Sequence, residues 1–450
     1  MLIETPEKLN DLAKICPFPL YAVGGTVRDA LAGLPCTRDW DLAAPVPAEK
    51  VAEFALRCGM KETAVYKNTG TVNFSDGENH YEFTSFRSDF YRGGEHAPAK
   101  ITFTDNIFAD AKRRDFRCNA VYYDIAKGEL IDPLNGIEDI SARIFATTRA
   151  AEEVFSEDGL RLMRLARQAG AMGFCPTEEC MAGARQNADK IQKISVERIC
   201  SELVSILHAD QKYGIADAHY KGLKILDETR VLDEILPELS AGRGMAQRSD
   251  FHNYDVLEHT LRACLYADRK IRLAALLHDI GKPYCFLQNG KYHGHDVEGA
   301  RIGRDILTRL KAPKKETETV VRLIATHMYD LDGKTRENKI RSFIIENYDI
   351  YPLILLIKQA DYTACKDDKN ICPAVKKFEE IREKMVKEGV PFTLKELKIG
   401  GNDLKGLTDP KNTGKILAEL FKKCTFDGRE NVREKLIRQA QKMIEKENEK

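Results

Sequence analysis

The sequence has 450 residues, of which 43% are hydrophobic and 31% charged, and its 70 basic side chains equal its 70 acidic ones. This balance is typical of a water-soluble protein of roughly two to four domains, and it excludes nucleic-acid binding through bulk charge. The chain has no run of about 18 apolar residues and no basic start, so we expect neither a membrane span nor a signal peptide. Twelve cysteines without a CxxC pair indicate reduced thiols in the cytoplasm.

Residues 1–145 alternate short apolar segments with helical ones, whereas the later chain has a different period. From about residue 150, apolar side chains recur at spacings of three and four, which predicts amphipathic helices. The sequence therefore predicts an α/β (α+β) head with a mixed β-sheet, followed by an elongated all-helical neck, body and tail. Strands are expected at 20–25, 39–44, 71–75, 81–87, 100–104 and 118–124.

Four parts are expected along the chain: a head at 1–145, a neck at 146–210, a helical body at 211–388 and a tail at 389–450. The turn-rich segment LSAGRGMAQRSDFHNYD interrupts the helices of the body. The last 40 residues contain eleven Lys or Arg and seven Asp or Glu. Such a composition is most common in helices whose charged side chains are simply solvated. The alternative is that these Lys and Arg side chains contact RNA phosphates.

Two aspartates, Asp39 and Asp41, stand at alternate positions of the second predicted strand. Alternate side chains of a strand point the same way, so both carboxylates face one side. A shared divalent cation relieves their repulsion, and Mg²⁺ prefers such oxygen ligands. Glu82, on a later predicted strand, is a candidate third carboxylate. Taken alone, an Asp-x-Asp pair also occurs by chance in surface turns.

The chain just before the aspartates is suited to phosphate binding. Gly24 and Gly25 allow the backbone to approach a ligand closely, and Arg28 follows about one helical turn later as an anion donor. A phosphate cradle beside a metal pair is typical of phosphoryl or nucleotidyl transfer. The combination makes a chance Asp-x-Asp a poor explanation.

The stretch YAVGGTVRDALAGLPCTRDWDLAA resembles the first motif of the class II tRNA nucleotidyltransferases (CCA-adding enzymes) and of the related bacterial poly(A) polymerases. In a second matching segment, KRRDFRCNAVYYD, Arg117 and Cys118 replace the Thr-Ile of the family pattern. After the first motif, the resemblance continues in chain order at 112–124, 132–139 and 157–167. It is weaker in the rest of the chain, toward the C-terminus.

This resemblance implies a role for each matched residue. Asp39 and Asp41 would hold the Mg²⁺ ions that activate the 3′-hydroxyl of an RNA and neutralise a nucleoside triphosphate. Asp115 would accept a hydrogen bond from the ribose 2′-hydroxyl, which favours ribonucleotides. Phosphate contacts are implied for Gly25, Arg28, Arg113 and Arg114.

The fourth motif, EDGLRLMRLAR, contains an aspartate and an arginine three residues apart. In a helix that starts near Ser156, Asp158 and Arg161 share a face. Cytosine and adenine both present an exocyclic amine beside an unprotonated ring nitrogen, so an accepting Asp and a donating Arg satisfy either base, whereas uracil and guanine are mismatched. Helix capping from Ser156 is the structural alternative. Arg164 and Arg167 continue this side as candidates for phosphate contacts.

The helical body contains histidines and aspartates, around the string AALLHDIGK, in a pattern that resembles the HD phosphohydrolase superfamily. Imidazole and carboxylate ligands on neighbouring helices suit a second divalent metal, and an inactive scaffold for RNA is the alternative. His295 and His327 are candidates to enlarge the site, while His208 and His252 are expected to be ordinary helix-end or surface residues. The four core positions are His259, His278, Asp279 and Asp361.

Three functions are compatible with these motifs. The expected one is a cytoplasmic CCA-adding enzyme that extends the tRNA 3′ end from CTP and ATP without a membrane partner, and whose C-terminal helices hold the tRNA. A poly(A) polymerase is the alternative, but residues 42–110 lack its usual Gly-Arg-[Arg/Lys]-Phe run. The third is an HD-type nucleotide phosphohydrolase whose head is a binding module. The loop at 87–103 argues against an enzyme that adds only CC.

Overall fold

The computed structural model describes residues 3–35 and 37–448. The chain forms two compact units, Met1–Ala241 with Ile306–Ala312 and Gly242–Asp305 with Pro313–Lys450. Cys36 and the last two residues of the charged tail lie outside the described residues. The eleven described cysteines are all free.

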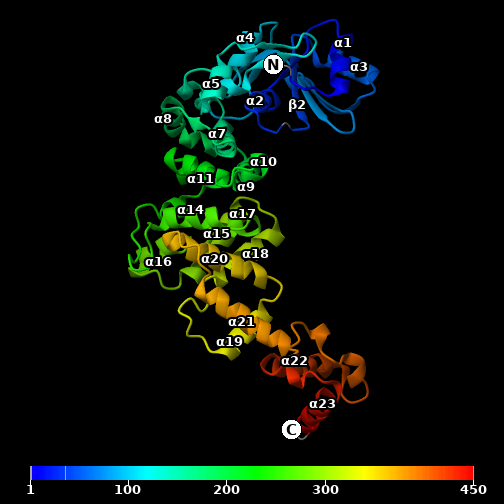
Figure 1. Cartoon of the computed structure of the whole chain (residues 1–450), viewed down its shortest axis with the longest axis vertical. Helices are drawn as coiled ribbons and strands as arrows, with labels where there is room; N and C mark the ends of the chain where they lie inside the picture. The colour runs from blue at the N-terminus through cyan, green and yellow to red at the C-terminus, as the bar shows by residue number, and fades with distance from the viewer. Residues whose placement is uncertain (1–2, 36, 449–450) are drawn as a thin grey trace. The chain divides into compact units, whose positions relative to one another are not determined.

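A seven-stranded sheet forms the head of the first unit (Figure 1). Its strand order is β3-β4-β5-β2-β1-β8-β9; β2 and β5 run parallel, and the other neighbours pair antiparallel. The predicted mixed sheet is therefore confirmed. The strands are β1 Tyr21–Val23, β2 Asp39–Ala44, β3 Lys61–Tyr66, β4 Thr71–Ser75, β5 His80–Ser85, β8 Tyr122–Asp124 and β9 Glu129–Ile131.

Short helices and a separate hairpin complete the head. The helix α3 is amphipathic and packs its apolar side on β3, β4 and β5, while α2 packs on β1 and β2. The hairpin of β6 and β7 carries a long connecting loop at 91–99. These elements are α1 Glu7–Ile15, α2 Gly25–Leu31, α3 Ala48–Arg57, β6 Arg87–Phe90, β7 Lys100–Phe103, α4 Ile107–Lys112, α5 Gly136–Ala142 and β10 Ile144–Phe145.

Four short strands of the head, β3, β6, β9 and β10, were not predicted, and the predicted strand at 118–124 is much shorter than expected. Every residue of β3 is exposed or half-buried, so this edge strand shows no alternation of apolar and polar residues. The strand β9 has only three residues. The predicted strand at 118–124 keeps only its last three residues, because Arg117–Asn119 form a 3-10 turn.

The rest of the first unit is mostly helical, as predicted. A two-residue strand, β11, departs from the expected all-helical neck and pairs in parallel with β10. The helix α7 packs closely on α9 and α11. The elements are α6 Ala151–Glu157, α7 Leu160–Met172, β11 Cys175–Pro176, α8 Glu178–Gln186, α9 Val196–Leu207, α10 Asp210–Tyr213, α11 Ala218–Glu228, α12 Val231–Ile235 and α13 Pro237–Ser240.

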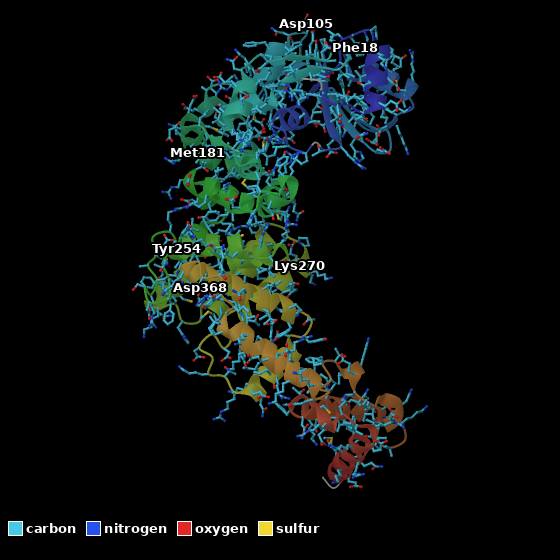
Figure 2. The ribbon with its side chains drawn as sticks, in the orientation of Figure 1. Phe18, Asp105, Met181, Tyr254, Lys270 and Asp368 are labelled. Atoms are coloured by element: carbon cyan, nitrogen blue, oxygen red, sulfur yellow. The ribbon has the colours of Figure 1, made fainter. Side chains whose placement is uncertain are left out.

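The second unit begins at Gly242, inside the predicted turn-rich segment at 239–255, and this segment has no helix between α13 and α14. At its centre, α14 packs on α15 and α20, and α15 packs on α18. Figure 2 marks this unit with the side chains of Tyr254, Lys270 and Asp368. Its first helices are α14 Val256–Tyr266, α15 Arg272–Leu277, α16 Lys282–Asn289, α17 His295–Arg309, α18 Lys314–Thr326, α19 Glu337–Glu346, α20 Tyr351–Lys366 and α21 Pro373–Lys387.

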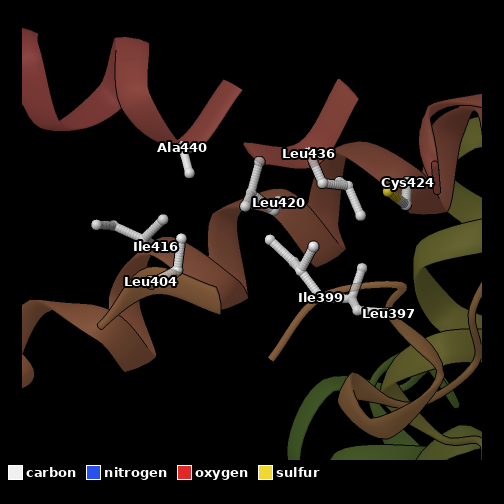
Figure 3. Close-up of a cluster of buried hydrophobic side chains, with 8 residues drawn as sticks. All are labelled: Leu397, Ile399, Leu404, Ile416, Leu420, Cys424, Leu436 and Ala440. Carbon is white, nitrogen blue, oxygen red and sulfur yellow. The ribbon is translucent and has the colours of Figure 1, made fainter. Parts of the chain in front are cut away.

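The C-terminal part of this unit has a small hydrophobic core of its own (Figure 3). The helices α22 Pro410–Phe426 and α23 Arg433–Asn448 face each other across it. Leu420 and Leu436 are fully buried there, so apolar packing and not helix propensity alone holds the charged helices in place. No described helix is both long and apolar enough to cross a bilayer.

Candidate active site and metal cluster

The first unit contains a cavity of about 640 Å³ that gathers nearly all the residues predicted to bind nucleotide. Its walls come from β2, β5, the β6–β7 loop and α7. Asp39 stands just outside this lining. The predicted residues that line the cavity are Gly24, Gly25, Arg28, Asp41, Glu82, Arg113, Arg114, Asp115, Asp158, Arg161, Arg164 and Arg167.

Three carboxylates lie on one face of the central strands. Along β2, the exposed Asp39 and Asp41 alternate with the buried Trp40 and Leu42, so both acids point to the same side. The strand β5 runs parallel to β2 and places Glu82 in register with Asp41. Because neighbouring strands lie about 4.8 Å apart, Glu82 is adjacent to the Asp-x-Asp pair.

Gly24 is the glycine that this site requires. Its φ of 81° lies in the left-handed region that favours glycine, and a Cβ atom there would stand 2.4 Å from Asp41 Oδ2. Gly25 is less constrained, since a Cβ at this position would meet Arg28 at 3.6 Å, an ordinary contact distance. The backbone at Gly24 thus lies directly against the carboxylate.

The surroundings of these carboxylates suit a bound cation. Asp41 is exposed toward the cavity, yet the protein packed around it raises its pKa, and Asp39 adds to this effect against the opposing charge of three arginines. Burial and the charge of Asp41 likewise raise the pKa of Glu82. A donor set made only of carboxylate oxygens, in surroundings that disfavour their negative charge, fits a hard divalent ion such as Mg²⁺.

One buried carboxylate, Asp110 in α4, holds the two arginines of the second motif. It accepts hydrogen bonds from Arg113 Nε at 2.8 Å and from Arg114 Nη2 at 3.1 Å. The Tyr122 hydroxyl donates to the same carboxylate at 2.6 Å. Burial raises the pKa of Asp110, but the charges of Arg114 and Arg113 outweigh burial and bring that pKa to about 2. Asp110 was not predicted from the sequence, although it stands two residues before the motif at 112–124.

Two arginines of α7 form further ion pairs at the cavity wall, Arg164 with Asp115 and Arg167 with Glu202. Arg164 donates to Asp115 Oδ2 from Nε at 2.8 Å and from Nη2 at 2.7 Å, and the Asn119 amide donates to Oδ1 at 2.9 Å. Burial raises the pKa of Asp115, but Arg164 outweighs it and holds that pKa well below its usual range. Arg167 Nε donates to Glu202 at 2.6 Å.

Arg28 is buried in a hydrogen-bond network that uses all five of its N–H groups. Two of them donate to Asp29, at 2.9 and 2.6 Å. Nη1 donates to Asn119 and to Gln168, both at 2.7 Å, and Nη2 donates to Tyr213 at 3.1 Å. The network therefore joins the head to α7 and α10, and in this structure Arg28 acts as a cross-link at the cavity wall.

The fourth motif does not form the single helix expected from Ser156. The helix α6 ends at Glu157, and α7 begins at Leu160. The break depends on a tertiary contact, because a Cβ atom at Gly159 would stand 2.3 Å from the carbonyl oxygen of Lys190. Ser156 lies inside α6, so the structural alternative of helix capping from this residue is wrong.

Asp158 and Arg161 nevertheless both line the cavity. Asp158 lies in the break, and its Oδ1 accepts the first N–H of α7, that of Leu160, at 2.9 Å. Arg161 is buried, and it donates from Nη1 to Glu157 at 2.9 Å and from Nη2 to the Arg113 carbonyl at 2.8 Å. These contacts fix the direction of its guanidinium.

The β6–β7 loop docks on this break and contacts both members of the pair. Gly94 exchanges two backbone hydrogen bonds of 3.1 Å with the residues on either side of Asp158. His96 Nδ1 lies 2.9 Å from Asp158 Oδ2, and the Arg161 guanidinium lies over the Tyr91 ring at 5.3 Å. Sequence reasoning identified the loop but not His96 or Tyr91, because an irregular segment has no period that predicts where its side chains point.

The second unit buries a cluster that unites the four predicted HD residues. His259 Nε2 lies 3.0 Å from Asp361 Oδ1 and 3.3 Å from Asp279 Oδ2. His278 Nε2 lies 3.2 Å from Asp279 Oδ2. The predicted extension also appears, since His295 Nε2 lies 3.2 Å from the other oxygen of Asp279. All three histidines are buried.

Backbone carbonyls orient three histidines of the cluster. Nδ1 of His278 lies 2.8 Å, and Nδ1 of His295 and of His327 each lie 2.7 Å, from the carbonyl oxygen three residues earlier. An Nδ1–H that donates to a carbonyl leaves Nε2 as a lone pair. Nε2 of His295 and of His327 are buried without a hydrogen-bond partner, and both face Asp279. Lone pairs that converge on carboxylates fit a divalent cation.

His208 lies at a helix end, as expected, but His252 is not a simple surface residue. His208 is the C-cap residue of α9. His252 is half-buried, and its ring packs edge-on against His259 with 4.9 Å between the ring centres. It lies in the segment before α14, so only the folded chain brings it to the cluster.

Three family models match this chain. The poly A polymerase head domain matches residues 20–146, and the HD domain matches residues 251–364. Between them, residues 173–242 match a model described as a probable RNA and SrmB-binding site of polymerase A.

Curated relatives cover most of the chain. An A-adding tRNA nucleotidyltransferase of Deinococcus radiodurans is 30% identical over 370 residues, which are 78% of this chain and 78% of the relative. A multifunctional CCA protein of Hahella chejuensis is 30% identical over 326 residues, 69% of this chain and 72% of the relative.

Solved structures show the same fold. The crystal structure of the Bacillus stearothermophilus CCA-adding enzyme in complex with CTP matches with a TM-score of 0.65 and 24% identity, over 99% of this chain and 100% of that one. A tRNA nucleotidyltransferase complexed with a primer tRNA and an incoming ATP analog matches with a TM-score of 0.54 and 20% identity, over 85% of this chain and all of that one.

Proposed function

The chain belongs to the tRNA nucleotidyltransferase (CCA-adding enzyme) family, and from this premise we propose that it adds C, C and A to the 3′ end of tRNA without a nucleic-acid template. CTP and ATP are the substrates, and pyrophosphate is released. In the reaction, the terminal 3′-hydroxyl attacks the α-phosphate of the bound nucleotide. We assign nucleotide transfer to residues 1–145, base recognition and RNA binding to 146–210, and tRNA binding to the helices of 389–450.

The observation that carries this proposal is the composition of the head cavity. The carboxylates Asp41 and Glu82 line it together with Arg113, Arg114 and Arg164. A negatively charged triphosphate fits beside the arginines, and the carboxylates suit the cation that such a nucleotide brings. When bound, Mg²⁺ supplies charge neutralisation and polarisation of the attacking hydroxyl.

The protein itself supplies orientation in this proposal. Asp39 and Asp41 hold the cation, and Glu82 is placed to support it. Asp110 keeps Arg113 and Arg114 in fixed directions at the cavity wall, so little reorganisation is needed when phosphate binds.

Base choice depends on Asp158 and Arg161. Asp158 is placed to accept the exocyclic amine of cytosine or adenine, and Arg161 to donate to the neighbouring ring nitrogen. A carboxylate oxygen has lone pairs beyond the one directed at His96, so Asp158 Oδ2 keeps the capacity to accept the exocyclic amine. Uracil and guanine leave unpaired polar groups at both positions, which disfavours UTP and GTP.

The test supplies tRNAs that end at the discriminator base, at C or at CC, each with one nucleotide at a time, and sequences the products. The proposal predicts CTP addition to the first two and ATP addition to the third, with little use of UTP or GTP. Long A tails, or equal use of all four nucleotides, would overturn it.

Addition of A alone is a second candidate, because the Deinococcus relative that covers 78% of this chain has that name. The same assay separates the two functions. An A-only enzyme extends the tRNA that ends in CC, and it leaves the other two tRNAs unextended even when CTP is present.

A metal-dependent phosphohydrolase activity of the second unit is supported by a separate observation. Nε2 of His295 and of His327 are buried, unpaired and directed at Asp279, an arrangement that fits a divalent cation held together with His278 and Asp361. Hydrolysis of p-nitrophenyl phosphate and of nucleotides in Mg²⁺, Mn²⁺, Co²⁺ or Ni²⁺ tests this activity. A protein that binds no metal at this cluster, or that hydrolyses none of these compounds, would contradict it.

A further inference from the structure

His259 differs from the other histidines of the HD cluster in how its second nitrogen is used. Its Nε2 lies 3.0 Å from Asp361 Oδ1, among the carboxylates of the cluster. Its Nδ1 is buried and has no hydrogen-bond partner in the structure. Histidines that bind a metal normally direct the other ring nitrogen at a carbonyl or carboxylate, as His278, His295 and His327 do here.

Two other ligand-type side chains take the place of that carbonyl. His252 and Cys365 form a group with His259 in which one ligand atom of each residue lies within 4.8 Å of the others. Nδ1 of His252 is also buried and without a hydrogen-bond partner. The cluster therefore has two sides, one rich in carboxylates and one made of two imidazoles and a thiol.

The fold brings these three residues together from separate elements. His259 stands on α14, and His252 lies in the segment before it. Cys365 stands on α20, one turn after Asp361, and its thiol donates to the Asp361 carbonyl at 3.3 Å. The helix α20 thus serves both sides of the cluster, with Asp361 on one and Cys365 on the other.

We propose that His252, His259 and Cys365 form a second cation site, selective for a soft divalent ion such as Zn²⁺, which shares His259 with the HD cluster. Imidazole and thiolate are the ligands that Zn²⁺ prefers, whereas Mg²⁺ and Mn²⁺ prefer the carboxylate side. The thiol of Cys365 loses its proton to solvent when the ion binds, and the His259 ring loses its N–H proton to solvent when each of its nitrogens holds a metal. Water would supply the fourth ligand of this site.

This site goes beyond the proposed phosphohydrolase activity and is separate from nucleotide addition in the head. Its chemistry gives it a specific signature, because a thiolate bound to Co²⁺ produces sulfur-to-metal charge-transfer absorption that imidazole and carboxylate ligands do not produce. The full-length protein is stripped with a chelator, loaded with Co²⁺ or Zn²⁺ and freed of excess metal. Absorption and bound metal per chain are then measured.

Cys365→Ser and His252→Ala are the test variants. Cys372→Ser is the control, because Cys372 is a buried thiol that packs with Ala374 and Val375 in a separate apolar cluster, whereas Cys365 is half-buried. We expect the charge-transfer band in the wild type and in the control, its loss in Cys365→Ser, and one fewer bound ion per chain in both test variants.

Two results would overturn the proposal: no charge-transfer band in the Co²⁺-loaded wild type, or a band and metal content that survive in Cys365→Ser. Thermal unfolding shows whether each variant is folded. If Cys365→Ser does not fold, the wild type still decides the question, since bound Zn²⁺ has to protect Cys365 from alkylation, and equal alkylation with and without Zn²⁺ contradicts the site. Phosphohydrolase activity is assayed in parallel, so its absence is distinguishable from absence of the thiolate site.

Discussion

The head cavity and the HD cluster both contain carboxylates that suit a cation, but the two sites differ in how far their side chains are buried. In the head, Asp39 and Asp41 are exposed, and the pKa of Asp41 is raised. In the cluster, His259 and His278 are fully buried, and their Nε2 atoms lie 3.0 Å from Asp361 Oδ1 and 3.2 Å from Asp279 Oδ2. An open site suits an ion that arrives with a nucleotide, whereas a buried one suits an ion that stays with the protein.

We expect the largest effect from His278→Ala, a variant that tests whether the two sites act independently. His278→Ala removes an imidazole from the cluster, so phosphate hydrolysis should fall by about 10³-fold or more, corresponding to about 4 kcal/mol. Addition of C and A should keep the wild-type rate, because each unit contains its own site. Parallel assays of both activities measure this, with exposed His293→Ala as the control. An equal loss of nucleotide addition in His278→Ala would show that the two sites do not act independently.

Gly24→Ala is expected to have the next largest effect, confined to the head. A Cβ atom would stand 2.4 Å from Asp41 Oδ2 and would force a residue with side chain into φ 81°. The carboxylate has to move, so the addition rate should fall about 100-fold. Gly25→Ala is the matched control, since its Cβ meets Arg28 at an ordinary 3.6 Å. Equal rates for the two variants would show that close packing on Asp41 is unimportant.

Asp110→Asn tests whether the arginines need their buried carboxylate. The pKa of Asp110 is lowered to about 2, so its ionised form stabilises the fold above the ordinary pKa of about 4. The variant should lose about 3 kcal/mol of unfolding free energy at pH 7, and the difference should shrink as pH falls from about 4 to 2. Urea unfolding across this range measures it. Asp105→Asn, an exposed control marked in Figure 2, should change little. A difference independent of pH would contradict the ion pairs.

His96→Ala should have the smallest effect, on nucleotide choice. Without the His96 contact, Asp158 keeps its bond to the Leu160 N–H but loses one restraint on its second oxygen. Discrimination of CTP over UTP should change by about tenfold or less, while stability stays within about 1 kcal/mol. Competition between the two nucleotides on one tRNA measures it. Exposed Glu95→Ala is the control. An unchanged ratio would show that the loop does not influence base choice.

These sites also differ in how far the sequence predicts them. The alternation of Asp39 and Asp41 follows from the period of a strand, so their shared face was predictable. The helix break at Asp158 was not, because it depends on Gly159 packing against the backbone of Lys190, a contact between distant parts of the chain. Full use of the N–H groups of Arg28 depends in the same way on partners more than 90 residues away.

The HD cluster shows the same limit more sharply. Its four core residues were predictable from their order along the chain, and two further histidines were candidates. His252 was set aside because a lone histidine in a turn-rich segment carries no signal, and Cys365 had none either. The two residues come close to His259 only in the folded chain, where α14 packs on α20.

The central claim is that carboxylates on β2 hold the cation for nucleotide transfer. The most direct measurement is the single-turnover rate of A addition to a tRNA ending in CC, at saturating Mg²⁺ and ATP, for Asp39→Asn, Asp41→Asn and Glu82→Gln. We expect losses of about 10³-fold or more for each aspartate variant and a smaller loss for Glu82→Gln. A wild-type rate in either aspartate variant would contradict it.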